Sequence, residues 1–315
     1  MNYGFTLPMR GPLSAPDSLA AIAKAGDDLG FGLLACSDHV ILPTATNSPF
    51  PYGTSSIASG GGPGDHLELV TTLGWLAAHT TRARLLTAVM VVPHRPAVLT
   101  AKALATVDYL SGGRLVIGAG AGWLREEFEA IGAPPFDHRG SVTDEYIAAF
   151  RELWRKDDPS FDGTYTSFHN IKAAPKPATP GGPPIWIGGE SPAALRRAGR
   201  TGDGWYPIGS NPTYPLRTPA QMAAPIATVR RHAQEAGRDP ATLDFGLQAG
   251  WLKIGEATPM DDGARMPLTG TADQISGDIH ALEDIGVRHL VVGLVGATVA
   301  ETTDRLAGFM AAFGG

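Results

Sequence analysis

Short apolar segments alternate with helical segments along the whole chain, and this alternation constrains the fold more than any other feature of the sequence. The apolar segments span residues 3–7, 32–37, 83–92, 114–119, 183–189, 203–208, 244–252 and 288–295. Alternating strands and helices build a parallel sheet that is buried on both faces. Eight such units without a linker predict a single α/β domain over residues 1–315, folded as a closed (β/α)8 TIM barrel. A doubly wound sheet is the alternative.

Start and stop signals support the helices between these segments. Short polar side chains cap helix starts, and glycine tolerates the left-handed conformation that ends a helix. The expected starts carry Asp65 with Glu68, Ser191 with Pro192, and Thr271 with Gln274, and the expected ends carry Gly30, Gly199 and Gly286.

Two insertions are too long to be simple barrel connections. Residues 44–64, rich in Gly, Pro and Ser, follow the second strand, and residues 156–183 precede the fifth. The first lies on the barrel face that carries catalytic groups, which favours a lid or a substrate loop. A disordered surface insertion is the alternative. In the second insertion, alternation around Asp162 and Gly163 predicts a small hairpin.

Composition excludes several classes of function. A net charge of -6 argues against nucleic-acid binding, which needs a basic surface. The chain has one cysteine, Cys36, and no H-x-H or H-E-x-x-H spacing, so we expect neither a disulfide framework nor a metal site. It has no signal-peptide pattern and no apolar run of about eighteen residues, which predicts a cytoplasmic protein without a membrane span. The expected partner is a small-molecule substrate.

The segment RLVIGAGAGWLREEFEA, residues 114–130, joins an apolar strand to a helix through a glycine-rich turn. Gly118 and Gly120 match the first two glycines of the dinucleotide-binding fingerprint. Trp123 stands where the third glycine belongs and would fill the space between helix and strand. The turn by itself therefore leaves open whether a dinucleotide binds.

Polar side chains follow the strands, where a barrel gathers its functional groups. Asp38 and His39 follow the second strand, and His94 and Arg95 follow the third. His39 is the main catalytic candidate, because an imidazole exchanges protons near neutral pH and Asp38 could tune its basicity. Strand parity places the two side chains on opposite sides, so they need not pair. A histidine that only caps the strand end is the alternative.

The turn after the fifth strand, GGES at residues 188–191, has the features of a phosphate site. Gly188 and Gly189 let backbone N–H groups approach an anion, and Ser191 caps a helix whose positive end faces the same place. A simple helix cap is the alternative. Glu190 would be an unfavourable neighbour for a phosphate unless it points to solvent. The helix that follows carries Arg196, Arg197 and Arg200, which predict either a solvated face or, through Arg200, contact with an anionic tail.

Taken together, three segments resemble the luciferase-like monooxygenase superfamily, and most closely its branch of oxidoreductases that depend on the deazaflavin coenzyme F420. They are GLLACSDHV, RLLTAVMVVPHRPAVLTAKALATVDYLSGGRLVIGAGAGWLREEFEAIG and PPIWIGGESPAALRRAGRTGDGWYP. The resemblance covers nearly the whole chain and implies a TIM barrel, a homodimer, and a flavin or deazaflavin at the carboxyl ends of the strands. It also implies that the strand-four turn makes room for the cofactor ring and is not a dinucleotide turn.

The resemblance assigns roles to particular residues of this chain. His39 with Asp38 would be catalytic, a strand-three bulge with a non-prolyl cis peptide near Val89–Met90 would support the ring, and Glu127 would border the site. The other cofactor-binding positions that it implies are Gly120, Gly122 and Trp123 beside the ring, and Gly188, Gly189 and Ser191 at the phosphate. Related sugar-phosphate dehydrogenases carry a catalytic glutamate where this chain has Trp123, so a sugar phosphate is not the expected substrate.

Three functions are compatible with these observations. The first is transfer of a hydride between coenzyme F420 and a small organic substrate. The second is an FMN-dependent monooxygenase that uses oxygen, since FMN shares the ring shape and the phosphate position. The third is a flavin- or deazaflavin-binding protein without catalytic activity.

Overall fold

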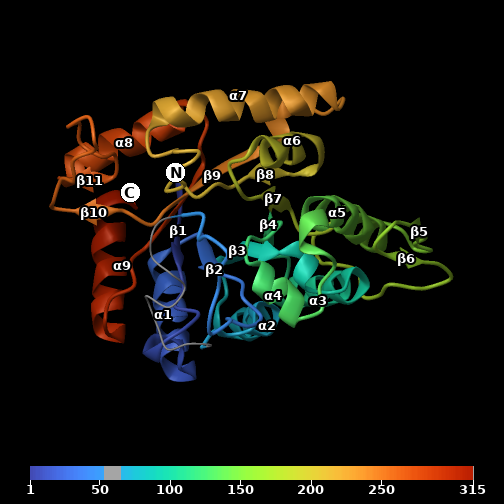
Figure 1. Ribbon diagram of the computed structural model, residues 1–315. Coiled ribbons are helices and arrows are strands. Elements are labelled where there is room, and N and C mark those ends of the chain that lie inside the picture. Colours follow the sequence, from blue (N-terminus) through green and yellow to red (C-terminus); the bar gives the residue numbers. More distant parts are fainter. Residues whose placement is uncertain (53–64, 315) are drawn as a thin grey trace.

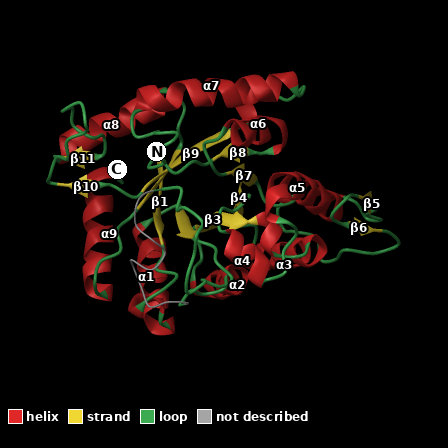
Figure 2. Ribbon diagram, in the orientation of Figure 1, coloured by secondary structure: helices red, strands yellow, loops and turns green. Residues whose placement is uncertain are grey.

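Eight parallel strands close into a barrel that the helices surround (Figures 1 and 2). This computed structural model describes residues 1–52 and 65–314. The order around the barrel is β1-β12-β9-β8-β7-β4-β3-β2, which confirms the predicted (β/α)8 barrel and excludes a doubly wound sheet. The barrel strands are β1 (Asn2–Thr6), β2 (Leu33–Cys36), β3 (Arg84–Val91), β4 (Leu115–Gly120), β7 (Ile185–Ile187), β8 (Gly204–Trp205), β9 (Asp244–Ala249) and β12 (His289–Val292).

The helices form the outer layer and follow the strands in sequence. They are α1 (Pro16–Leu29), α2 (Leu69–His79), α3 (Ala97–Ser111), α4 (Arg125–Ala130), α5 (Arg139–Arg155), α6 (Pro192–Thr201), α7 (Pro219–Glu235), α8 (Ala272–Asp284) and α9 (Val299–Phe313). None of those within the described residues is long and apolar enough to cross a membrane.

The strands read as continuously apolar because both of their faces are buried. One face fills the barrel interior, where a separate cluster contains Leu33, Ala35, Leu86, Ala88, Val116, Trp186, Tyr206 and Val291. Alternate strand residues, such as Leu34 and Leu85, belong to the larger core that includes the helices. Trp186 and Tyr206 supply the large rings of this cluster, and the Trp186 ring lies 4.5 Å from the ring of His289 at the start of β12.

Most of the predicted helix signals have the expected geometry. Thr271 and Gln274 form a complete capping box, Ser191 accepts from the Ala194 N–H, and Gly30 ends α1 with a φ of 89°. Gly286, just beyond α8, has a φ of 99°.

Two of the signals were wrong. The residue that caps α2 is Glu68, whose side chain accepts from the Thr71 N–H, and not Asp65. Gly199 does not end a helix, because α6 continues to Thr201. A Cβ at Gly199 would lie 2.5 Å from the Val229 carbonyl oxygen of α7, so this glycine instead allows α6 and α7 to pack closely.

The second predicted insertion contains the expected hairpin. β5 (Phe161–Asp162) and β6 (Ser167–Phe168) pair antiparallel and extend away from the barrel beyond α5 (Figure 1). A further excursion after β9 was not predicted. There β9 ends at Ala249, earlier than expected, and β10 (Lys253–Ile254) pairs with β11 (Thr269–Gly270). Of the first insertion, residues 53–64 lie outside the described residues.

Candidate functional site

One cavity of about 410 Å³ opens at the carboxyl ends of the barrel strands. It is lined by residues in the carboxyl-terminal parts of β2, β3, β4, β7, β8 and β9 or just after these strands, which are far apart in the sequence. Nine of the ten predicted site residues line it, namely Asp38, His39, Val89, Gly120, Gly122, Trp123, Gly188, Gly189 and Ser191. The tenth, Met90, does not: its side chain is fully buried in the core between the barrel and the helices. Strand alternation turns Met90 outward when Val89 faces the mouth.

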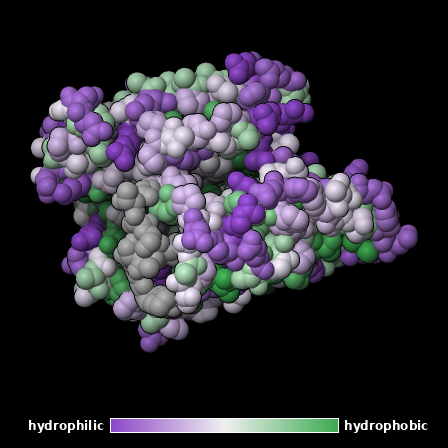
Figure 3. Space-filling view, in the orientation of Figure 1, coloured by the Kyte–Doolittle hydropathy of each residue, from purple (hydrophilic) through white to green (hydrophobic). Residues whose placement is uncertain are grey.

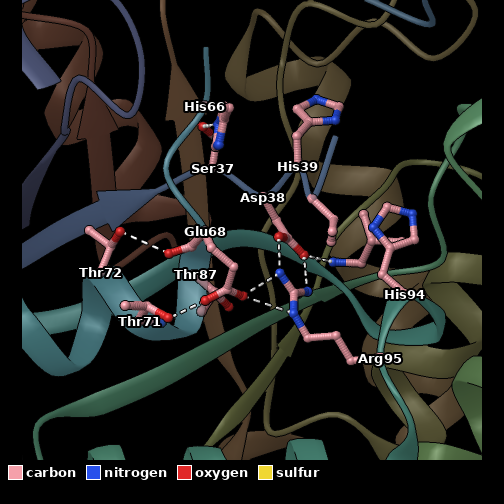
Figure 4. A network of polar contacts seen from close by, with 12 residues as sticks. Ser37, Asp38, His39, His66, Glu68, Thr71, Thr72, Thr87, His94 and Arg95 are labelled. Carbon is pink, nitrogen blue, oxygen red and sulfur yellow. Dashed lines mark hydrogen bonds and ion pairs between the residues drawn. The ribbon is translucent and has the colours of Figure 1, made fainter. Parts of the chain in front are cut away.

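Asp38 and His39 point in different directions, as strand parity predicts (Figure 4). The Asp38 carboxylate is buried and accepts two hydrogen bonds from the Arg95 guanidinium, at 2.9 and 2.8 Å. It also accepts from the Val91 N–H at 2.9 Å. Arg95 in turn donates to Glu68 at the start of α2. Asp38 therefore joins the ends of β2 and β3 and makes no contact with the His39 ring.

The partner of His39 is Glu127 on α4. His39 Nδ1 lies 2.8 Å from Glu127 Oε2, and the N–H groups of Val40 and Ile41 donate to Glu127 Oε1 at 2.7 and 3.3 Å. Burial opposes ionisation of this carboxyl, but the bond from His39 and the nearby positive groups outweigh it and hold the pKa of Glu127 below its usual value. An ionised carboxylate keeps the His39 proton on Nδ1 and leaves Nε2 free to exchange a proton.

Two further histidines lie close to this pair. His94 Nδ1 is 3.9 Å from Glu127 Oε1, and the His94 side chain is 1% exposed. His66 lies edge-on to the His39 ring, with both of its nitrogens bonded, to Ser37 Oγ and the Leu67 carbonyl. The sequence placed His94 at a strand end, and the resemblance placed Glu127 beside the site, but neither indicated that Glu127 would approach His94 from α4.

One wall of the cavity is formed by a bulge in β3. The register between β3 and β4 shifts between Thr87 and Met90, and the peptide Ala88–Val89 is cis. The bulge and the non-prolyl cis bond were both expected, but the bond lies one residue earlier than Val89–Met90. Val89 stands in the mouth of the barrel and lines the cavity.

Two of the glycines around this bulge leave room for the Val89 side chain. A Cβ at Gly120 would lie 2.7 Å from Val89 Cγ2, and one at Gly188 would lie 2.9 Å from Val89 Cγ1. Gly122 has a φ of 84° and borders Val91 and Phe128. These glycines therefore provide room for protein side chains, and Val89 presents the surface that a ligand would meet.

Aromatic residues cover the outer part of the cavity. Phe50 and Tyr52, from the described part of the first insertion, line it together with Trp123. The Phe50 and Trp123 rings meet edge to face at 5.3 Å. Glu126 on α4 fixes this segment by accepting from Asn47 N–H and from Ser48 Oγ, both at 2.6 Å. Placing aromatic side chains over the cavity is consistent with a substrate loop.

The β7 end of the cavity has the features of an anion site. Gly189 has a φ of 88°, and its carbonyl accepts from Trp205 Nε1 at 2.9 Å, which fixes the turn before α6. Arg139 and Arg197 line the same cavity and bring positive charge. Arg197 is held by Asp144 and the Gly140 carbonyl, and Arg139 by the Gly122 carbonyl.

The sequence left open where Glu190 and the α6 arginines point. Glu190 does not point to solvent: it is buried and accepts from the Ile208 N–H at 2.8 Å and from Asn211 Nδ2 at 2.9 Å. Burial raises the pKa of Glu190, although the hydrogen bonds from Asn211 and from the Ile208 N–H act in the opposite direction. Of the α6 arginines, Arg197 and not Arg200 reaches the cavity, because Arg200 lies on the exposed face.

Comparison with known proteins assigns the family. The sequence profile of the luciferase-like monooxygenase family matches residues 1–251. The chain belongs to this family. Members of the family are oxidoreductases, monooxygenases among them.

Individual relatives cover most of the chain. The FMNH2-dependent dimethylsulfone monooxygenase of Pseudomonas putida is 30% identical over 294 residues, which cover 80% of each chain. An uncharacterized protein of Mycobacterium tuberculosis is 32% identical over 259 residues, covering 81% of this chain and 83% of its own. Among solved structures, an F420-dependent secondary alcohol dehydrogenase has a TM-score of 0.75 at 18% identity and covers 99% of this chain and 98% of its own. At 18% identity, the similarity to this solved structure shows a shared fold and no more.

Proposed function

We propose that this member of the luciferase-like family transfers a hydride between the deazaflavin coenzyme F420 and a small organic substrate. One observation carries the proposal: the Val89 bulge, the His39–Glu127 pair and the start of α6 all face a single cavity. The choice of a deazaflavin is supported by the resemblance of the three sequence segments to the F420-dependent branch.

The residues of the cavity fit a tricyclic cofactor that carries a phosphate. Val89 would support the ring on its apolar face, with Gly120 and Gly188 keeping the surrounding backbone close. The phosphate would lie at the N-terminal end of α6, near Gly189 and Ser191, where the helix dipole and Arg197 favour an anion. When bound, the ring supplies the hydride chemistry.

The protein itself would handle the proton. His39 is 22% exposed through its side chain, and Glu127 holds its Nδ1 side, so Nε2 is the nitrogen available to a substrate. Replacing His39 with Ala should leave the cofactor affinity within a few-fold of the wild-type value and slow turnover about a hundredfold. Equal turnover of the two proteins would remove His39 from the mechanism.

Titration of the purified protein with each cofactor tests the proposal. We expect coenzyme F420 to bind with a micromolar dissociation constant and FMN to bind more weakly, as followed by the change in cofactor absorbance. Weak or absent binding of both cofactors would contradict the proposal. Binding of F420 without hydride loss to any of a panel of enones, imines, nitro compounds and ketones would favour a non-catalytic binding protein.

An FMN-dependent monooxygenase is the second candidate, and two Pseudomonas relatives favour it. The Pseudomonas putida relative is named for its dependence on FMNH2. The two cofactors share the shape of the ring and the position of the phosphate, so the same cavity would accommodate either. Micromolar binding of FMN with no binding of F420, together with oxygen consumption when reduced FMN is supplied, would replace the first candidate with this one.

A further inference from the structure

His94 is a buried polar side chain whose hydrogen bonds the fold does not satisfy. It lies in the short turn Val92–His94 between β3 and α3, and neither ring nitrogen has a hydrogen-bond partner among the described residues. Leaving a buried polar atom unpaired is unfavourable, because the atom loses its hydrogen bonds to water and gains none in the protein. Within the described chain, Trp186 Nε1 is the other such atom, but Trp186 lies in the barrel interior, whereas His94 lines the cavity.

The surroundings of His94 keep its ring neutral. Its ring meets Phe128 edge to face at 4.8 Å, and burial lowers its pKa, although Glu127 and Asp38 act in the opposite direction. Glu127 Oε1 is 3.9 Å from Nδ1, which is too far for a hydrogen bond. That oxygen already accepts the N–H groups of Val40 and Ile41.

The nearby carboxylate also selects the position of the His94 proton. A neutral imidazole places its single N–H on one nitrogen and a lone pair on the other. The negative charge of Glu127 favours the proton on Nδ1, the nitrogen that faces it, and leaves Nε2 as an acceptor. His39 is arranged in the same way, because its Nδ1 lies 2.8 Å from the other Glu127 oxygen. One carboxylate therefore gives both histidines an acceptor nitrogen.

We propose that His94 is a further substrate-binding residue of the cavity, and that it accepts a hydrogen bond from an O–H or N–H group of a small alcohol or amine. The inference rests on the proposed function, since it takes the ligand to be the substrate that enters beside the cofactor. A substrate donor would satisfy a ring nitrogen that the protein leaves unpaired. A ligand that carries only acceptors, such as a ketone or an ether, would leave it unpaired.

The stability of the ligand-free protein provides a first test. His94→Leu removes an unsatisfied polar group and keeps an apolar side chain, so its melting temperature should equal or exceed that of the wild type. His66→Leu is the matched control, because it breaks bonds to Ser37 Oγ and the Leu67 carbonyl and should lower the melting temperature. A decrease in His94→Leu as large as that in His66→Leu would show that His94 serves the fold, and would overturn the proposal.

The binding test uses two ligands of equal size, 1-methylcyclohexanol and 2-methylcyclohexanone. The first donates a hydrogen bond and has no hydride to lose, and the second only accepts. With oxidised cofactor bound, wild type should bind the alcohol about tenfold more tightly than the ketone. His94→Leu should greatly reduce this preference, leaving only the part that the His39 Nε2 acceptor supplies, and His94→Asn, which keeps an acceptor, should lie between the two proteins.

The outcomes separate this inference from the proposed function. No preference in the wild type, or an unchanged preference in His94→Leu, would overturn the role of His94 while leaving cofactor binding intact. If neither cofactor binds, the proposed function fails instead. The same two ligands can then be compared on the cofactor-free protein by the shift that each produces in the melting temperature, with the same outcomes deciding the role of His94.

Discussion

At the scale of single residues, the site depends on one buried carboxylate. Glu127 holds the His39 ring through Oε2 and the backbone of Val40 through Oε1. In Glu127→Gln the amide can still accept from Val40, but it presents N–H groups to His39 and disfavours the tautomer with its proton on Nδ1. Turnover should fall about a hundredfold with little change in cofactor affinity. Glu129→Gln, an exposed position on the same helix, should match the wild type.

The stability effect of the same change should depend on pH. The pKa of Glu127 is lowered by folding from a usual value of 4.5, so its ionised form stabilises the protein above that pH, and the contribution is lost as pH falls below it. The loss of stability in Glu127→Gln, measured by urea unfolding, should therefore be largest near pH 7 and shrink toward pH 3. A loss that is constant across this range would mean that charge is not its cause.

A third prediction at this scale concerns Asp38, whose side chain is fully buried and bonded by Arg95 through both of its oxygens. Removing one partner of a buried ion pair leaves an uncompensated charge, so Arg95→Leu should lower the free energy of unfolding by about 3–5 kcal/mol. Lys24→Gln, which breaks the exposed pair with Asp28, should change it by about half a kcal/mol or less. Similar effects of the two substitutions in urea unfolding would contradict the assignment.

At the scale of elements, one substitution tests the packing of α6 on α7, because helix propensity and close packing predict stability changes of opposite sign. Helix propensity alone predicts that Gly199→Ala stabilises the protein by about 1 kcal/mol. A Cβ there, however, would lie 2.5 Å from the Val229 carbonyl oxygen and 2.9 Å from the Ala233 nitrogen, so overpacking should instead destabilise it by about 1–3 kcal/mol. Gly308→Ala on α9, where nothing lies within 4 Å, should be stabilising.

The elements also show which parts of the fold could be predicted from the sequence. Strand and helix alternation predicted every barrel strand, because burial on both faces leaves a continuous apolar signal. Gly199 was misread because a glycine that ends a helix and one that lets two helices approach have the same local signature. The small β10–β11 sheet was missed because strands of two residues carry no periodicity.

At the scale of the whole molecule, barrel closure assembles the site. The topology alone was enough to predict that Asp38, His39, Gly120 and Gly188 would meet, since the carboxyl ends of barrel strands share one face. The topology did not predict which side chains would contact one another within the site. That Glu127 meets His39 and that Arg197 reaches the cavity depend on how α4 and α6 are rotated, which a single sequence does not specify.

The predicted homodimer is also a property of the whole molecule. One face of the molecule is largely hydrophilic with smaller hydrophobic patches (Figure 3). Helix α3 nevertheless exposes Leu99, Tyr109 and Leu110 by 64%, 56% and 66%. Leu99 and Leu110 are eleven positions apart, about three helical turns, so they lie on the same side of α3. Exposed apolar side chains that share a helix face are typical of an interface between chains.

We therefore expect light scattering to give the mass of two chains for the wild type and of one chain for the double variant Leu99→Glu, Leu110→Glu. The matched control is Ala223→Glu, Ala227→Glu on the exposed side of α7, which should stay dimeric. Since no residue of α3 lines the described cavity, the monomeric variant should keep its cofactor affinity. A wild-type protein with the mass of one chain would refute the predicted dimer, and a double variant that stays dimeric would place the interface elsewhere.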